Sequence, residues 1–473
     1  MSNLLGDLSN AAHTLGAQQA GVQTAGRNLA NVNTSGYARQ RVVLGDRSVI
    51  DTPFGPQGSG VELLRTEQMR DQFLDTTVTR ELSHTALLHA QRSAYGRAET
   101  SLGETVDRSG ASGSIADPSN STKGISSALN DFFNGWEALS ANPADTGARQ
   151  VLLQKANTLA DKFNVADQRL AGLQGDLTAQ VTTDVSTVNG LLKQIASLNR
   201  EIGAAEVQAP GSAVDLRDQR QARLEQLANY MDFTTQPLAG SGGQIEVIAK
   251  DTSGGSFSLV QGDAVRGGLT FTGTGFTGGQ PPVALSFQGG SLAGNLSARD
   301  GVVASLRAGL RSAATQLAAA VNTAYNPGGA SSDFFLVPPV TGIIALSPSL
   351  TFNTLRASAT GNSGANDIAL AVGNVAQQQF STAGGDSIDG TISGFFNRTV
   401  TGLGTTLAAV NTRLDDQQAV QQMATQQRDS VSGVSMDEEM ADMMKYQRAY
   451  EASARVVRTL DDLLDTIVHG LSR

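Results

Sequence analysis

Few side-chain patterns in this chain of 473 residues could do chemistry. Residues 273–278 match GxGxxG, a pattern in which a glycine-rich turn delivers a dinucleotide pyrophosphate to the N-terminus of a helix. Here the pattern runs into the sequence GQPP at 279–282, which begins no helix. We therefore reject a dinucleotide site.

Histidines and acids form no recognisable site either. Two zinc ligands on one helical face are four residues apart, whereas the closest histidine pair here is five apart. The histidines are His13, His84, His89 and His469, and the densest acidic cluster is Asp461, Asp462 and Asp465. The cluster predicts a solvated helix face. We expect no catalytic, cofactor-binding or metal-binding residue.

Long heptad helices dominate the chain instead. The N-terminal seam follows 4-3 steps, and the C-terminal seam follows 3-4 steps, a pattern typical of helices that pair with other helices. The first seam is Leu4, Leu8, Ala11, Leu15, Gln18, Val22, Ala25, Leu29 and Val32; the last is Val457, Leu460, Leu464, Ile467 and Leu471, with Met440, Met443, Tyr446, Tyr450 and Ala454 upstream. We expect the two ends to meet and to form an assembly surface.

Charge supports that pairing and excludes other classes. Residues 1–48 carry a balance of +2, and residues 431–473 a balance of −3. The whole chain has a net charge of −10, no basic run and only 5% aromatic residues, which argues against nucleic acid. There is no cysteine, no apolar stretch of membrane-spanning length and no cleavable signal peptide pattern at the N-terminus.

The middle of the chain holds a second heptad seam and a β-rich segment. The seam runs from Leu152 to Ile202 with one stutter at Val181, and it predicts a helix of about sixty residues that is either continuous or broken once. Residues 233–296 alternate β-formers with glycine-rich turns, which predicts a small all-β insert. Residues 45–60 predict a connector, 65–101 a helix, 103–124 a loop, and 326–394 an irregular segment.

These patterns predict a mainly α protein with a small all-β insert and nested, discontinuous domains. Residues 1–59 and 431–473 would form a terminal coiled-coil domain. Residues 60–231 and 298–430 would form a long-helix bundle body, and residues 232–297 a β-rich outer domain.

Two terminal motifs resemble a known group. By local chemistry, the sequence RNLANVNTSGYARQR at 27–41 is a helix C-cap followed by an extended arm. At the other end, SGVSMDEEM at 432–440 fits a capping box, with Ser435 as the N-cap and Glu438 three residues later. Together with YQRAYEASARV at 446–456, these strings resemble the ends of bacterial flagellar axial proteins: rod, hook and hook-associated proteins.

Two central segments narrow the resemblance to the hook-associated protein type 1 family. They are ALNDFFNGWEALSANP at 128–143, followed by ARQVL at 148–152, and IASLNREI at 195–202, followed by DLRDQR at 215–220. The resemblance implies a non-enzymatic structural protein that forms a helical or ring-like homo-oligomer between hook and filament. It also implies hook protein on one side and the next hook-associated protein on the other, with no membrane or nucleic-acid partner.

The resemblance further implies an extracellular location in the flagellum, reached by type III export without a cleaved signal peptide. A cytoplasmic chaperone would bind the C-terminal helix before export. The expected assembly interface comprises Leu4, Leu8, Leu15, Val22, Leu29, Val32, Tyr37, Met440, Tyr450, Val457, Leu460, Leu464, Ile467 and Leu471.

Other functions stay open at this point. Within the flagellar group, the alternatives are the type 3 junction protein and the hook protein. From another class, the β insert could bind or cleave glycans. A glycosidase needs a convergent pair of carboxyl groups, whereas the acids of the insert, Glu246, Asp251 and Asp263, lie apart in the sequence.

Overall fold

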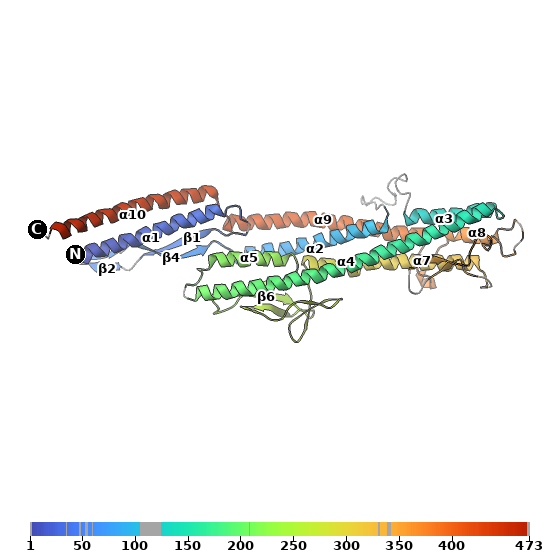
Figure 1. Ribbon diagram of the computed structural model, residues 1–473, viewed down its shortest axis with the longest axis horizontal. Helices are drawn as coiled ribbons and strands as arrows, with labels where there is room; N and C mark the ends of the chain where they lie inside the picture. Colours follow the sequence, from blue (N-terminus) through green and yellow to red (C-terminus); the bar gives the residue numbers. More distant parts are fainter. Residues whose placement is uncertain are drawn as a thin grey trace. The chain divides into compact units, whose positions relative to one another are not determined.

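A computed structural model describes residues 2–34, 36–46, 49–52, 55–58, 60–104, 124–207, 209–329, 332–337, 342–360, 362 and 364–470. The chain forms two compact units. The first contains residues 1–86, 184–290 and 417–473, and the second contains residues 87–183 and 291–416. The fold is mainly helical with small antiparallel sheets, as the sequence predicts (Figure 1).

The first unit holds both ends of the chain. Helix α1 (Ser2–Ala30) packs along α10 (Met436–Gly470), and Figure 1 shows the two side by side. Strand β1 (Gln40–Asp46) pairs antiparallel with β4 (Val61–Gln68), and β2 (Val49–Thr52) pairs with β3 (Gly55–Gly58) in a hairpin. The expected extended arm after Gly36 therefore leads into strand β1 at Gln40, and the expected connector at 45–60 consists mainly of strands over its described residues.

The β insert also lies in the first unit. Its four-stranded sheet has the order β5-β6-β7-β8, and its three-stranded sheet the order β11-β10-β9. The strands are β5 (Thr234–Pro237), β6 (Ile245–Lys250), β7 (Ser256–Gln261), β8 (Ala264–Val265), β9 (Thr270–Phe271), β10 (Phe276–Gly278) and β11 (Val283–Leu285). The insert follows α5 (Val214–Ala228), and its ends meet, because Asp232 Oδ1 accepts hydrogen bonds from the backbone amides of Gln288 and Gly289 at 2.9 and 3.2 Å.

The second unit is built around one helical core. Its helices are α3 (Ile125–Ala141), α6 (Gly290–Ser297), the π-helix η1 (Ala298–Val303), α7 (Ala304–Tyr325) and α8 (Asp367–Asn374), with residues 87–102, 146–183 and 392–416 of three longer helices. It also contains the strand pair β12 (Phe335–Leu336) and β13 (Ala345–Leu346) and the short turns η2 (Val375–Gln377) and η3 (Thr382–Gly384). An aromatic cluster of Phe132, Trp136, Tyr325, Phe334 and Phe335 fills the core.

The longest helices follow the sequence patterns closely. Helix α4 (Thr146–Glu206) is continuous for 61 residues, and every expected seam position from Leu152 to Ile202 is buried. Helix α9 (Ile392–Ser432) is 41 residues long. The apolar heptad repeat of α4 therefore corresponds to a stripe of side chains that is buried along the whole seam.

Two sequence expectations need correction. The helix expected from Arg65 begins later, as α2 (Gln72–Leu102), because residues 61–68 pair with β1 and Asp71 Oδ1 accepts a capping hydrogen bond from the Phe73 amide at 2.8 Å. The segment 326–394, expected to be irregular, contains α8 and a strand pair. Most of the loop expected at 103–124 lies outside the described residues.

The three-part domain division remains a prediction. The expected terminal domain belongs to the first unit, as does the expected β insert up to residue 290, whereas residues 291–297 belong to the second unit. Among the described residues, no helix is both long enough and apolar enough to cross a bilayer.

Candidate assembly site

The paired terminal helices run antiparallel and meet through small residues. The face of α1 that is buried consists of Ala17, Gly21, Thr24, Ala25 and Asn28. At Gly21 the helices approach so closely that an added Cβ would lie 2.5 Å from Cδ1 of Tyr446 on α10. Glycine allows this approach because it has no side chain to displace the partner ring.

The expected interface residues flank this contact rather than form its centre. On α1 and just after it, Leu8, Leu15, Val22, Leu29, Val32 and Tyr37 are half-buried, as are Val457, Leu460, Leu464 and Ile467 on α10. Met440 and Tyr450 are exposed, at 40% and 37%. The side chain of Leu4 and the whole of Leu471 lie outside the described residues. Val22 and Tyr450 help to line a groove of about 320 Å³ between the two helices.

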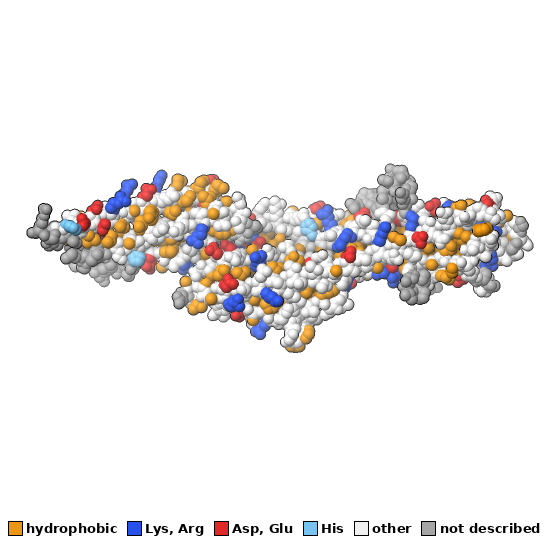
Figure 2. Space-filling model, in the orientation of Figure 1, with side chains coloured by type: hydrophobic (Ala, Val, Ile, Leu, Met, Phe, Trp, Pro, Cys, Tyr) orange, Lys and Arg blue, Asp and Glu red, His pale blue; other side chains and the backbone are white. Residues whose placement is uncertain are grey.

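Apolar side chains remain uncovered on the outer surface of α10. Figure 2 shows hydrophobic side chains gathered over this helix. Met436, Met444, Val456 and Leu463 are 50%, 53%, 52% and 48% exposed. Methionine adapts its shape to irregular partners, so such a face suits contact with another protein surface.

A buried polar network closes the end of the helix pair. Asn28 Nδ2, near the end of α1, donates to Glu439 Oε2 in the first turn of α10 at 3.0 Å and to the Gln40 carbonyl at 2.8 Å. Asn28 Oδ1 accepts from the Tyr37 hydroxyl at 2.9 Å and from the Gln40 amide at 3.0 Å. Asn28 and Glu439 are only 1% and 2% exposed, so these hydrogen bonds satisfy groups that water does not reach.

Arg39 supplies the positive charge that faces the carboxylates of this network. Its Nε lies 2.6 Å from Glu439 Oε1, and its terminal nitrogens lie 2.7 Å from Glu438 and 3.4 Å from Asp442. Burial alone would lower the pKa of Arg39, but Glu439 and then Glu438 raise it above its ordinary value. The capping-box expectation is corrected here: Glu438 contacts Arg39, and no hydrogen bond returns from it to Ser435 among the described residues.

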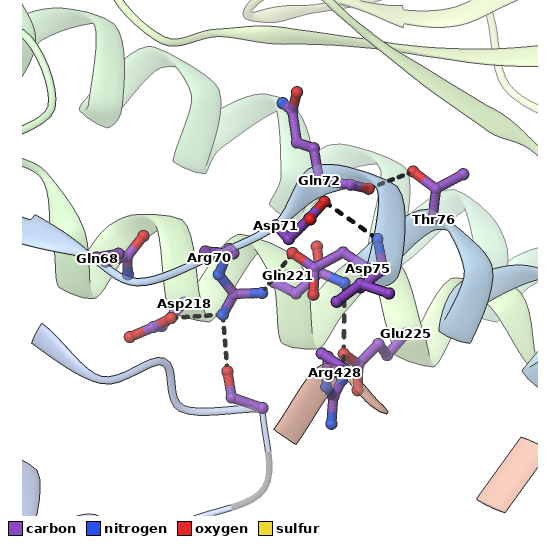
Figure 3. A network of polar contacts seen from close by, with 12 residues as sticks. Gln68, Arg70, Asp71, Gln72, Asp75, Thr76, Asp218, Gln221, Glu225 and Arg428 are labelled. Atoms are coloured by element: carbon purple, nitrogen blue, oxygen red, sulfur yellow. Dashed lines mark hydrogen bonds and ion pairs between the residues drawn. The ribbon is translucent and has the colours of Figure 1, made fainter. Parts of the chain in front are cut away.

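A second network joins the turn after α1 to α2 and α5 (Figure 3). Arg70 donates to the Gly36 carbonyl at 2.8 Å, to Asp218 Oδ1 at 2.6 Å and to Asp75 Oδ2 at 2.9 Å. Burial raises the pKa of Asp218 to about 6 even though Arg70 opposes the shift. Burial, followed by the nearby carboxylates Asp218 and Asp215, raises the pKa of Tyr37 to about 12, so its hydroxyl stays a donor at neutral pH.

The structure brings together motifs that the sequence analysis treats separately. The motif at 27–41 supplies Asn28, Tyr37, Arg39 and Gln40, and the motif at 432–440 supplies Glu438 and Glu439. The motif at 215–220 joins them, because Gln40 Nε2 donates to Asp215 Oδ1 at 2.9 Å. These contacts were not predicted from the sequence. The only sequence feature that pointed to them was the opposite charge of the two ends of the chain.

Both networks join separate elements of the first unit. Their carboxylates Glu438, Glu439, Asp75 and Asp218 each lie beside an arginine. Across the described parts of the chain, no cluster of three or more histidines and acids could hold a metal ion. In the insert, Asp251 Oδ1 accepts from the backbone amides of Ser253 and Gly255, which is a turn-stabilising role.

Comparison with known proteins gives two family matches. Residues 118–335 match the helical domain of flagellar hook-associated protein FlgK. Residues 425–469 match the C-terminal region of the flagellar basal body rod FlgEFG proteins. The second match covers most of α10, and the first covers α3, α4 and the insert.

Two curated relatives agree with these matches, one of them over its whole length. The chain is 27% identical over 525 residues to flagellar hook-associated protein 1 of Bacillus subtilis, covering 100% of this chain and 99% of that relative. It is 27% identical over 270 residues to flagellar hook-associated protein 1 of Escherichia coli, covering 56% of this chain and 44% of that relative. The flagellar hook junction protein FlgK of Burkholderia pseudomallei aligns in structure over 56% of this chain and 47% of that one, with a TM-score of 0.47 and 22% identity.

Together, the family matches and the relatives define the chain as a structural protein of the bacterial flagellum, one that assembles with hook components. Within that class, the helical-domain match and the relatives support a hook-associated protein of type 1, the protein of the hook–filament junction.

Proposed function

We propose that this protein polymerises as a non-enzymatic adaptor between the flagellar hook and the filament. The observation that carries the proposal is the antiparallel α1–α10 pair, which is fixed at one end by the Asn28–Arg39–Glu439 network and leaves apolar side chains of α10 uncovered. A rigid helix pair with an uncovered apolar face is suited to pack against further helices in an assembly.

The proposed partners follow from that position. Copies of the chain form a helical or ring-like homo-oligomer, with hook protein on one side and the next hook-associated protein on the other. The half-buried and exposed interface residues named above contact these neighbours. Nucleic acid and membrane have no part in this function.

The proposal includes the route to the site of assembly. The chain leaves the cell through the flagellar export apparatus and works outside the cell. A cytoplasmic chaperone covers the C-terminal helix before export, because the apolar residues of α10 would otherwise favour association inside the cell.

Complementation tests the adaptor function. A strain that lacks its own copy of the gene should shed its filaments while keeping intact hooks, and expression of this chain should restore attached filaments in electron micrographs. A strain that sheds filaments equally with and without this chain, although the chain is exported, would contradict the proposal.

A further inference from the structure

A large pocket lies within the first unit beside the Arg70 network. Its volume is about 860 Å³, and its walls come from the end of β4, the first turns of α2, the first half of α5 and strands β5 and β6. Pockets of this size hold ligands or several side chains of a partner segment. The nearby side chain of Phe73 is 75% exposed.

One cation in the pocket wall makes no ion pair among the described residues, and the carboxylate that raises its pKa, Glu206, is itself paired with Arg217. Arg220 is only 8% exposed, and Nη1 donates to Asn199 Oδ1 and to the Gly243 carbonyl, both at 2.8 Å. Among the described residues, it makes no ion pair and no other hydrogen bond. Burial, followed by the neighbouring Arg217, lowers the pKa of Arg220 to about 10, so the guanidinium is still charged at neutral pH.

The other arginines of the pocket are already paired. Arg70 contacts Asp75 and Asp218, Arg217 contacts Glu206 at 2.6 Å, and Arg65 contacts Glu67 at 3.1 Å. The remaining acid of the lining, Asp71, caps α2. The acids of the lining are therefore engaged elsewhere, and Arg220 lacks the carboxylate that each of its neighbours has.

A buried, unpaired charge is costly, and its cost falls when a group of opposite charge enters the site. We propose that this pocket receives a carboxylate-bearing segment of a second copy of this chain, which pairs with Arg220. This inference rests on the proposed homo-oligomer. The chain has 44 acidic and 34 basic residues, so neighbouring copies present carboxylates in excess.

Arg220→Lys allows the proposed contact with a carboxylate to be detected by chemical cross-linking. A lysine amine forms an amide with a carboxylate that it touches when a carbodiimide activates the acid, whereas arginine does not react. Flagella are isolated from cells that express the Arg220→Lys chain, treated with carbodiimide, and analysed by peptide mapping. Arg223→Lys, one turn further on α5 and outside the pocket, is the matched control.

We expect a cross-link from position 220 to an Asp or Glu of another copy, in at least tenfold excess over any intermolecular link from position 223. Labelled and unlabelled copies mixed before assembly distinguish links between copies from links within one chain. Links only to acids of the same chain, links to a different flagellar protein, or no link at position 220 would each overturn the inference. A chain that is absent from isolated flagella would refute the proposed function, and the inference with it.

Arg220→Gln separates the two possible sources of the anion. It keeps a side-chain donor toward Asn199 but removes the charge, and Arg223→Gln is its control. Sodium acetate, compared with sodium chloride at equal ionic strength, should leave the melting temperature of both variants and of the wild type unchanged within about 1 °C. Stabilisation of the wild type by acetate that Arg220→Gln abolishes, together with no cross-link between copies at position 220, would assign the pocket to a small solution anion and overturn the second copy as its source.

Discussion

Replacing Arg39 with glutamine should release the start of α10 from the end of α1. The change leaves Glu439, whose side chain is 3% exposed, without the cation that lies 2.6 Å from it. Removal of one partner of a buried ion pair costs about 3–5 kcal/mol. The Arg39 side chain is 23% exposed, so water replaces part of the interaction and we expect a cost of roughly 2–4 kcal/mol.

Hydrogen–deuterium exchange of peptides from 436–450 measures this cost. A tenfold change in an equilibrium corresponds to about 1.36 kcal/mol, so the amides of this segment should exchange about 30-fold to about 1,000-fold faster. Arg41→Gln, on strand β1 two residues further along the chain, is the matched control. Arg41 is 60% exposed and pairs with Glu67, and such pairs contribute about 1 kcal/mol or less, which limits the expected acceleration to about fivefold.

A double variant checks the mechanism. Arg39→Gln combined with Glu439→Gln removes the buried charge together with its partner, so much of the lost protection should return. Equal exchange rates in Arg39→Gln and Arg41→Gln, or a double variant that is less protected than Arg39→Gln, would refute the role assigned to this ion pair.

Three further predictions concern the first unit. Gly21→Val places a side chain where the Tyr446 ring lies and should destabilise the α1–α10 contact by about 1–3 kcal/mol. Gly16→Ala has open space around it and should stabilise α1 by up to about 1 kcal/mol. Chemical denaturation measures the unfolding free energy of both variants. Leu464→Asp puts a charge in the half-buried seam and should abolish incorporation between hook and filament, and with it motility, without changing the melting of the second unit. Thr466 is exposed, so Thr466→Asp should leave motility unchanged. The pKa of Asp218 is raised from 3.8 to about 6, so the folded protein binds more protons than the unfolded protein between those values. The unfolding free energy of the wild type should therefore fall as pH rises through this window, by on the order of 3 kcal/mol relative to Asp218→Asn, and stay level above it; parallel curves for the two proteins would disprove the shift.

The sequence by itself determined the long helices, the strands of the β insert and the class of the protein. The seam from Leu152 to Ile202 predicts α4 because helical periodicity is a local property, repeated along one stripe of one element. The alternating segments of the insert likewise predict its strands. The motifs near both ends and in the middle indicate the flagellar family, which the comparisons confirm.

Tertiary structure decided which side of each terminal helix is covered. The seam predicted on α1 includes Ala25, which is buried, but its leucines are only half-buried; the rest of the buried face is Ala17, Gly21, Thr24 and Asn28, and Met440 on α10 is exposed. The reason is distance between helices: a glycine at the crossing point lets the Tyr446 ring approach the backbone, which turns the leucines toward the edges of the contact.

The networks depended on the tertiary structure entirely. Asn28 and Glu439 are 411 positions apart, and each reads locally as a helix-end residue. In the sequence, Arg220 is one of several charged residues in the motif at 215–220. Only the structure shows that it is buried beside a pocket and makes no ion pair among the described residues. Local spacing fixes which residues share an element, whereas the pairing of buried charges depends on which elements meet, and that is decided when the whole chain folds.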